Sequence, residues 1–213
     1  MKNLENLLHK FDILTCKFNS LRREGCTVKR YKILPSQPVI CGDIELSAVE
    51  VGEIENIRQW RNQQSNVLRQ SQEISVEDQL IYFENKVWQD LESSKPNQIL
   101  LSIYKNGVHV GYGGLVHISW ENLRAEISFL LDTSLVDELD IYAEVFHNFL
   151  EAIEKISRDN LKLHRLHLET YSFRNKHLHV IESRGFTNEG TFVDHNFIDG
   201  SWFNSILHGK ILE

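Results

Sequence analysis

The chain has 213 residues, with 23 basic and 30 acidic side chains and a formal net charge of −7. Apolar residues make up 41% and charged residues 25% of the sequence, which is ordinary for a globular domain and excludes a disordered or low-complexity chain. The acidic balance argues against nucleic acid and anionic membranes as partners, and no stretch approaches the roughly 18 apolar residues of a membrane span.

The N-terminal region indicates a soluble, cytoplasmic protein. Charged residues interrupt its leucines at positions 5, 10 and 12, which does not fit a signal peptide. The three cysteines (Cys16, Cys26 and Cys41) have no zinc-site spacing, and their odd number is typical of a reducing compartment.

A seam of apolar residues at alternating steps of three and four predicts a helix in the same region: Leu4, Leu7, Phe11, Leu14, Phe18 and Leu21. We therefore expect a helical extension, residues 1–41, ahead of a main domain, residues 42–213. The seam is short for a free coiled coil, so packing on its own domain is favoured, with a homodimer through this helix as the alternative.

The first half of the main domain mixes strand and helix patterns. A strand near Ile44–Val49 precedes a helix over Glu53–Asn62, and a capping box that begins at Ser75 opens a second helix through Trp88. Three consecutive antiparallel strands follow, from Ile99 to the Asn106-Gly107 turn, over Val108–Ser119 and over Ala125–Asp132.

The second half predicts a helix, a strand, a short helix and a closing hairpin. The first helix carries an apolar stripe from Ile141 to Ile156. The later elements are a strand over Leu163–Tyr171, a helix over Asn175–Arg184, and strands over Thr191–Ile198 and Trp202–Ile211 that turn at Asp199-Gly200. This order predicts an α/β fold whose sheet has parallel and antiparallel pairs.

Five strings in this order resemble the GNAT superfamily of N-acyltransferases: Trp60-Arg61-Asn62, Gly111–Leu115, Ala125–Phe129, Tyr171–Phe173 and Gly185–Gly190. They are most similar to the branch of ribosomal-protein N-terminal acetyltransferases and amino-sugar N-acetyltransferases. The resemblance covers residues 43–212 and implies a twisted, mostly antiparallel sheet flanked by helices. Within it, the strands Ala125–Asp132 and Leu163–Tyr171 are expected to be parallel and to diverge at one end.

The resemblance also implies acetyl-CoA as co-substrate. Its pantetheine arm would lie along Phe129, Leu130 and Leu131, and its diphosphate at the start of the next helix, at Leu139, Asp140 and Ile141. Leu139 and Ile141 stand where the family has glycines, and the carboxylates of residues 137, 138 and 140 lie in the same loop. At about 5 Å and a dielectric near 20, each would oppose the diphosphate by roughly 3 kcal/mol.

The helix after the second of these strands departs from the family in two more positions. Arg174 replaces the family's asparagine, and Ile181 replaces the tyrosine that protonates the leaving thiolate. Isoleucine cannot act as an acid, whereas Arg174 could bind a phosphate and offset the missing glycines.

Glu126 is the candidate general base, because acyl transfer to an amine requires removal of a proton. A structural strand glutamate is an equally weighted interpretation. Tyr171 is the candidate acid, with His177 as another option, although each residue type is more often an ordinary packing or surface group. Trp60, Arg61 and Asn62 would bind the acceptor, or simply pack the helix end onto the sheet.

Other motifs do not predict a site. The histidine pairs His164-x-x-His167 and His177-x-His179 do not fit one element, so we expect no metal site. The glycines at 111, 113 and 114 lie inside a strand and indicate close backbone packing or a bulge rather than a nucleotide loop.

Two functional hypotheses follow. The first is an acyl-CoA-dependent N-acyltransferase acting on a primary amine, with an amino-sugar nucleotide slightly favoured over a protein N-terminus as acceptor. The second is a GNAT-like module that has lost coenzyme binding and serves assembly, or a transferase that takes its acyl group from a carrier protein; the acidic loop, Arg174 and Ile181 motivate it.

Overall fold

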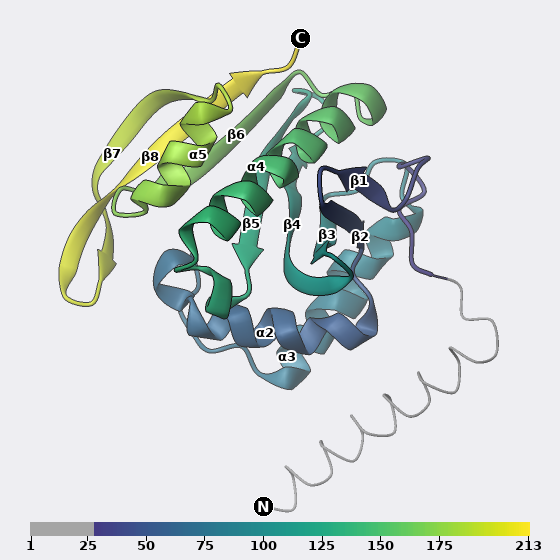
Figure 1. The fold of residues 1–213 in the computed structure, drawn as a ribbon, viewed down its shortest axis with the longest axis horizontal. Coiled ribbons are helices and arrows are strands. Elements are labelled where there is room, and N and C mark those ends of the chain that lie inside the picture. Colours follow the sequence, from purple (N-terminus) through teal and green to yellow (C-terminus); the bar gives the residue numbers. More distant parts are fainter. Residues whose placement is uncertain (1–27) are drawn as a thin grey trace, which may run out of the picture.

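The computed structural model describes residues 28–213. The predicted apolar seam from Leu4 to Leu21, and the homodimer it suggested, lie outside the described residues. Residues 28–213 form one twisted sheet of eight strands in the order β1-β2-β3-β4-β5-β6-β8-β7 (Figure 1). The strands are β1 (Val39–Cys41), β2 (Ile44–Ala48), β3 (Ile99–Lys105), β4 (Val108–Ser119), β5 (Arg124–Leu131), β6 (Arg165–Tyr171), β7 (Thr187–Ile198) and β8 (Ser201–Ile211).

The helices of this part of the chain connect the strands. The α-helices are α2 (Ile54–Gln63), α3 (Val76–Tyr82), α4 (Leu139–Lys155) and α5 (Asn175–Ser183). Short 3-10 turns are Val51–Glu53, Ser65–Val67, Trp88–Glu92 and Thr133–Leu135, and single π-helical turns are Phe83–Val87 and Ile156–Asn160. None of these helices is long and apolar enough to cross a membrane.

Local signals placed most boundaries. Ser75 caps α3, because its hydroxyl accepts the Asp78 N–H at 3.0 Å. The predicted α-helix through Trp88 is too long: α3 ends at Tyr82 and continues as π and 3-10 turns. Both two-residue hairpin turns are confirmed, since Asn106 and Asp199 have φ of 52° and 48° and the glycine after each is also left-handed.

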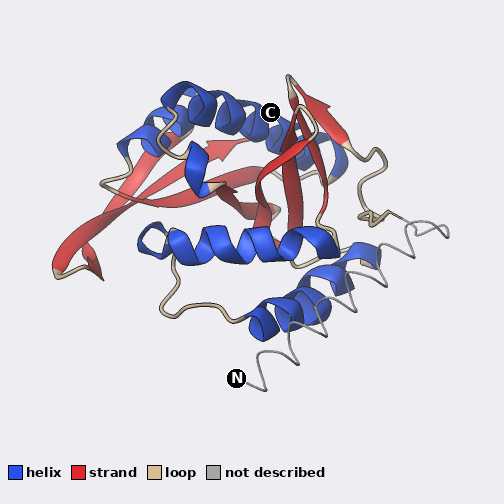
Figure 2. Ribbon diagram, turned by 60° about the horizontal axis from the view of Figure 1, so that its bottom comes forward, coloured by secondary structure: helices blue, strands red, loops and turns tan. Residues whose placement is uncertain are grey.

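Helices cover both faces of the sheet (Figure 2). One core lies under α4, where Phe129 of β5 stacks on Phe146 with ring centroids 4.2 Å apart. The other lies under α2 and α3 and includes Trp60, Phe83 and Leu130. Because strand side chains alternate, neighbouring positions of β5 belong to different cores.

The segment before β2 packs on the same sheet. The Tyr31 side chain is 1% exposed, and its hydroxyl accepts the Leu100 N–H at 2.9 Å. The short strand β1 pairs with β2 and was not predicted. Residues 28–41 therefore share a core with the residues that follow them, and in this described part they are not helical.

The glycines of β4 allow close packing against its neighbours. A Cβ at Gly114, whose φ is +149°, would overlap the carbonyl oxygen of Ile99. A Cβ at Gly113 would lie 2.8 Å from the ring of Phe149 on α4. The predicted role of these glycines in backbone packing is confirmed.

The parallel pair β5–β6 determines the position of the site. Its pairing covers only Arg124↔Arg165 to Glu126↔His167, after which β6 continues along β8 alone. The predicted parallel and diverging strands are confirmed, with α4 as their connection (Figure 1).

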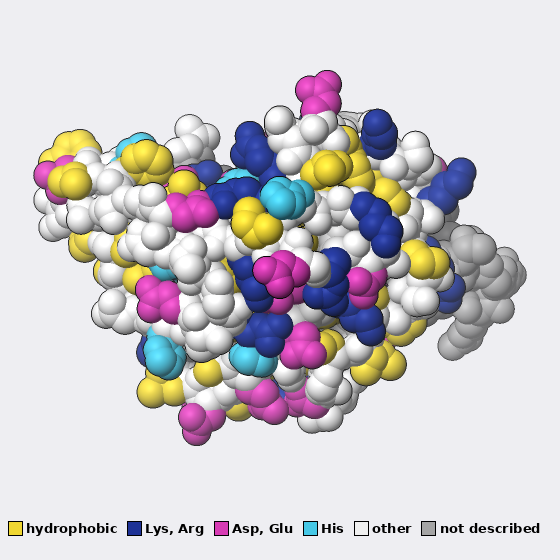
Figure 3. All heavy atoms as spheres, turned by 90° about the horizontal axis from the view of Figure 1, so that it is seen from above, with side chains coloured by type: hydrophobic (Ala, Val, Ile, Leu, Met, Phe, Trp, Pro, Cys, Tyr) yellow, Lys and Arg dark blue, Asp and Glu magenta, His cyan; other side chains and the backbone are white. Residues whose placement is uncertain are grey.

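The surface seen in Figure 3 carries basic and acidic side chains side by side rather than in a single-sign patch. Ion pairs at the end of α4 are of this kind, including Arg184–Glu154 at 3.2 Å and Lys210–Glu154 at 2.7 Å. Among residues 28–213, no group of three His, Cys, Asp or Glu residues is arranged to hold a metal ion.

Candidate active site

The gap between β5 and β6 exposes main-chain groups of β5. Asp132 donates its N–H to the carbonyl of Val110 on β4. Because hydrogen-bonded pairs alternate in an antiparallel ladder, the even-numbered residues of β5 direct their main-chain groups toward β4 and the odd-numbered residues direct theirs away from it. The main-chain groups of Phe129 and Leu131 therefore face β6, where pairing has ended. The Leu131 carbonyl accepts from the buried Gln64 side chain at 2.8 Å.

A pocket of about 360 Å³ lies in this gap, and we call it the central pocket. Charged and polar residues that line it come from β4, β5, β6, α2, α5 and the loop after α2: Arg61, Arg69, His117, Glu126, Ser128, Glu169, Tyr171, Arg174 and His177.

Glu126 is the last residue of β5 that pairs with β6, and it is 8% exposed. Its carboxylate forms an ion pair with Arg69, and the same guanidinium lies 3.7 Å from Glu169 on β6. His117 Nε2 lies 3.9 Å from the other carboxylate oxygen of Glu126. The Arg69 side chain, which comes from a loop, thus bridges the carboxylates of Glu126 on β5 and Glu169 on β6.

Tyr171 ends β6 on the wall of the same pocket. Burial raises the pKa of its phenol, with Glu169 also raising it and the guanidinium groups of Arg69 and Arg174 lowering it. The phenol is therefore protonated at neutral pH and can donate a proton or a hydrogen bond into the pocket.

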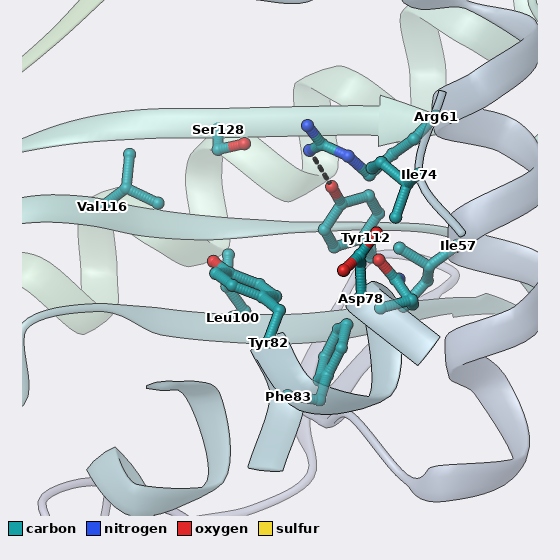
Figure 4. Close-up of a pocket in the computed structure, with 11 residues that line it drawn as sticks. Ile57, Arg61, Ile74, Asp78, Tyr82, Phe83, Leu100, Tyr112, Val116 and Ser128 are labelled. Atoms are coloured by element: carbon teal, nitrogen blue, oxygen red, sulfur yellow. Dashed lines mark hydrogen bonds between the residues drawn. The ribbon is translucent and has the colours of Figure 1, made fainter. Parts of the chain in front are cut away.

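A second pocket of about 350 Å³, which we call the α2–α3 pocket, opens on the face under these two helices (Figure 4). Most of its wall is apolar, with Ile57, Ile74, Phe83, Leu100 and Val116. Arg61 donates to the Tyr112 hydroxyl at 2.7 Å, and Ser128 points toward the same guanidinium (Figure 4). Arg61, Val116 and Ser128 also line the central pocket, so the two pockets share a wall.

A third pocket of about 380 Å³, the α4–α5 pocket, lies at the start of both helices and shares Arg174 and His177 with the central pocket. Helix α4 begins at Leu139, and its first backbone bond runs from Tyr142 N–H to Glu138. The amides of residues 139–141 therefore have no helical partner, and the Glu138 side chain makes no capping hydrogen bond. Such unpaired amides at a helix start are a geometry that can bind an anion.

Three side chains connect α4 and α5 under these pockets. Arg174 approaches the Tyr142 hydroxyl at 3.4 Å, and that hydroxyl lies 2.8 Å from His177 Nδ1. Burial lowers the pKa of His177 well below its ordinary value and raises that of Tyr142, which Arg174 partly offsets. If Tyr142 donates its O–H to Nδ1 of the neutral His177 ring, the ring proton lies on Nε2.

The other sequence-predicted site residues lie in different surroundings. Phe129 lines the central pocket, whereas the Leu130 and Leu131 side chains are buried in the two cores. Trp60 packs against His109 in the second core, with ring centroids 4.8 Å apart, and lines none of the three pockets. The Asn62 side chain donates to the Ile74 carbonyl at 3.0 Å and accepts the Ile74 N–H at 2.9 Å, which fixes the loop between α2 and α3.

Residues of the loop at the start of α4 face solvent. Leu139 is 56% exposed, Asp140 is exposed, and Ile141 packs partly against the first core. The Asp137 side chain is fully exposed and lies 3.7 Å from the Lys176 ammonium. The carboxylates of this loop are therefore solvated, although Asp137 also lines the α4–α5 pocket.

Sequence reasoning missed Arg69, Tyr142 and the Arg61–Tyr112 bond as parts of the site. Arg69 and Glu126 are 57 residues apart, and Tyr142 and His177 are 35 apart. The alignment of Tyr142 with the family's helix start marked its position but gave no sign of its partner. No local pattern could have indicated these pairs.

Comparisons with known proteins agree with this geometry. The family model "Acetyltransferase (GNAT) domain" matches residues 46–207. Spermidine N-acetyltransferase of Vibrio cholerae in complex with CoA and spermine has a TM-score of 0.69 and 17% identity over 80% of this chain and 96% of that chain. Its dodecameric intermediate-state structure has a TM-score of 0.66 and 18% identity over 80% and 94%. No curated protein matches the chain.

The similarity to the Vibrio cholerae structures is below 20% identity and shows a shared fold. The family model covers more than half of the chain, including the helices α2–α5 and the strands β3–β6 that contribute residues to the three pockets. The chain belongs to the acetyltransferase (GNAT) domain family and is an acyl-CoA-dependent N-acetyltransferase with acetyl-CoA as its co-substrate.

Proposed function

We propose that the chain transfers an acetyl group from acetyl-CoA to a primary amine by direct attack, with Glu126 as general base. The observation that carries this proposal is the position of Glu126 at the point where β5 and β6 separate, on the wall of the central pocket. A carboxylate there can accept the proton that the attacking amine must lose.

The residues present fit the donor. Main-chain groups of Phe129 and Leu131 face the gap and can bind the pantetheine amides, although Gln64 already occupies the Leu131 carbonyl. The amides at the start of α4 and the Arg174 guanidinium can bind the diphosphate. The main-chain N–H groups of Leu139 and Ile141 can donate to a phosphate just as those of glycine can, because the Leu139 side chain is exposed to solvent and does not cover them.

Arg69 supports an amine as acceptor. Its guanidinium lies between Glu126 and Glu169, at a place where a substrate ammonium would find the same two carboxylates. Arg69 is on a loop and its side chain is 53% exposed, so an incoming amine can displace it toward solvent. Glu126 then accepts a proton from the ammonium, and the neutral amine attacks the thioester carbonyl.

The leaving thiolate needs a proton in the family mechanism, and Ile181 is buried and cannot supply it. We propose Tyr171 as the donor, because its protonated phenol lines the same central pocket as Glu126. His177, with its proton on Nε2, is the other donor that lines this pocket.

As the acceptor we favour an amino-sugar nucleotide slightly over a protein N-terminus, because Arg61 of the Trp60-Arg61-Asn62 string lines both the central pocket and the α2–α3 pocket. The Vibrio cholerae structures have names that specify spermidine and spermine, which adds a polyamine as a third class to be compared. The assignment to the ribosomal-protein and amino-sugar branch is part of the same proposal.

The test is Glu126→Gln, with Glu169→Gln as its matched control. Both variants remove one carboxylate contact of Arg69, but only Glu126 is placed as base. We expect Glu126→Gln to lower amine-dependent release of CoA by roughly 100-fold and Glu169→Gln to lower it much less. Calorimetry should show unchanged acetyl-CoA affinity in both. Equal turnover in wild type and Glu126→Gln would remove Glu126 from the mechanism.

A further inference from the structure

Arg61 has an unusual set of partners for a cation in an apolar pocket. It lies in the last turn of α2 and is partly buried, and its one hydrogen bond within residues 28–213 goes to the neutral Tyr112 hydroxyl. Arg58, one turn earlier on the same helix, is instead paired with Glu55 at 2.7 Å. No carboxylate of the described residues forms an ion pair with Arg61, including Asp78 in the same pocket.

This arrangement leaves N–H donors of the guanidinium free. A guanidinium has five N–H groups in a plane and matches the oxygens of a carboxylate or phosphate. Removing it from water without an anion costs free energy that a ligand anion would return. Figure 4 shows the guanidinium directed along the sheet toward Ser128, whose hydroxyl points back toward it.

The position of Arg61 relates it to the acceptor rather than to the donor. It lies on the wall shared by the central pocket, which holds Glu126, and the α2–α3 pocket. Arg174, which fits the donor's phosphates, lines both the central pocket and the α4–α5 pocket at the start of α4, whereas Arg61 is not part of the α4–α5 pocket. An acceptor whose amine meets Glu126 and whose body extends into the α2–α3 pocket would therefore pass Arg61.

We propose that the acceptor bears an anionic group, a carboxylate or a phosphate, that Arg61 binds together with the Ser128 hydroxyl while the amine faces Glu126. This inference rests on the proposed function and narrows its substrate class. It disfavours a polyamine, whose second cation would meet Arg61, and the apolar wall of the α2–α3 pocket would hold the body of the molecule.

Asp78 and Arg69 must be counted with Arg61. Asp78 lines the α2–α3 pocket and is exposed, its carboxylate accepts a hydrogen bond from the Ser75 hydroxyl at 2.7 Å, and it forms no ion pair with Arg61. Arg69 pairs with Glu126 and lies near Glu169, so this group of one cation and two carboxylates favours the amine of the acceptor rather than its anion. Of the residues on the shared wall, Arg61, Val116 and Ser128, only Arg61 is charged.

The experiment compares two pairs of amines that differ in one anionic group. The pairs are glucosamine 6-phosphate with glucosamine, and L-phenylalanine with 2-phenylethylamine, and spermidine serves as a polycation. Binding is measured by calorimetry and kcat/KM by release of CoA, in wild type, Arg61→Met and Arg61→Lys. Arg158→Met is the control, because it removes the same charge from an exposed pair with Asp159.

We expect wild type to prefer the anionic member of at least one pair by roughly 10- to 100-fold, as for a hydrogen bond to a charged group. The pair that shows it distinguishes phosphate from carboxylate. Arg61→Met should abolish this preference, Arg61→Lys should keep part of it, and Arg158→Met should keep all of it. A ratio between two amines in one variant does not respond to a uniform loss of folded protein.

Equal affinity for both members of each pair, or binding of neither anionic amine, would overturn the inference. So would an Arg61→Met variant that loses acetyl-CoA affinity and treats both members alike, since Arg61 would then serve the donor. Acetylation of spermidine with no preference for the anionic amines would leave the proposed function intact and refute this inference. If an anionic amine binds in an Arg61-dependent way but is never acetylated, the inference about Arg61 stands and the proposed function is refuted.

Discussion

Replacing His109 by leucine should remove a large part of the acid sensitivity of the fold. His109 lies on β4 with its ring near Trp60 and Tyr104, at centroid distances of 4.8 and 5.3 Å. Neither ring nitrogen makes a well-aligned hydrogen bond to the described residues, although the Gly111 main chain and the Asp132 carboxylate raise the pKa of His109 and offset part of the effect of burial. Burial lowers the pKa of His109 from 6.5 to about 4.

The sign and size of the effect follow from this shift. Between pH 6.5 and 4 the unfolded chain binds a proton at this histidine and the folded chain does not, so stability falls as pH falls through the window. At 1.36 kcal/mol per pKa unit, the loss is about 3 kcal/mol below pH 4. About 2 kcal/mol of it is lost between roughly pH 7.5 and 5.

Urea unfolding at these two pH values would measure the effect in wild type, His109→Leu and His164→Leu. Leucine is close to histidine in volume, and His164 is an exposed residue that serves as the control. We expect the stability lost on acidification to be about 2 kcal/mol smaller in His109→Leu than in the other two. Other groups, including His167 and His177, contribute equally to all three proteins. The same pH dependence in all three would refute the reasoning.

Two further predictions concern β4 and the donor site. Gly114→Ala should destabilise the fold by about 3 kcal/mol or more in urea unfolding, because of its φ of +149° and its contact with Ile99, whereas Gly190→Ala, with open space around it, should change stability little. Neutralising the acidic loop (Asp137→Asn, Glu138→Gln and Asp140→Asn together) should tighten acetyl-CoA binding by roughly two- to fivefold at low salt, and Arg174→Ala should weaken it. No change in calorimetric affinity in either variant would contradict the proposed diphosphate site.

Much of the fold could be predicted because its signals are local. The Asn106-Gly107 and Asp199-Gly200 turns have the left-handed conformations that such pairs favour, and they fixed two hairpins. Strand β1 was missed because three residues with a half-exposed pattern give no periodicity. The end of α3 was missed because the apolar positions through Val87 keep a helical spacing while the backbone widens into a π turn.

The site was less predictable because its contacts join distant segments. Glu126 came from the resemblance to the family, and its burial at the last β5–β6 pair could not be read from the sequence. Its partner Arg69 lies in a loop without periodicity. Trp60 and Arg61 are adjacent on α2, yet the helical turn directs one into the core and the other to the pockets, which the string alone did not distinguish.

The acidic loop at the start of α4 illustrates how exposure changes an electrostatic argument. At an effective dielectric near 20, three carboxylates beside a diphosphate would make tight binding hard to explain. The Asp137 side chain is fully exposed beside Lys176, and residues 138 and 140 also face solvent, so water reduces each repulsion about fourfold and salt reduces it further. The helix start is built from main-chain amides, which leucine and isoleucine supply as readily as glycine once their side chains turn away. We therefore expect the departures from the family pattern to weaken acetyl-CoA binding without removing the proposed diphosphate site at the start of α4.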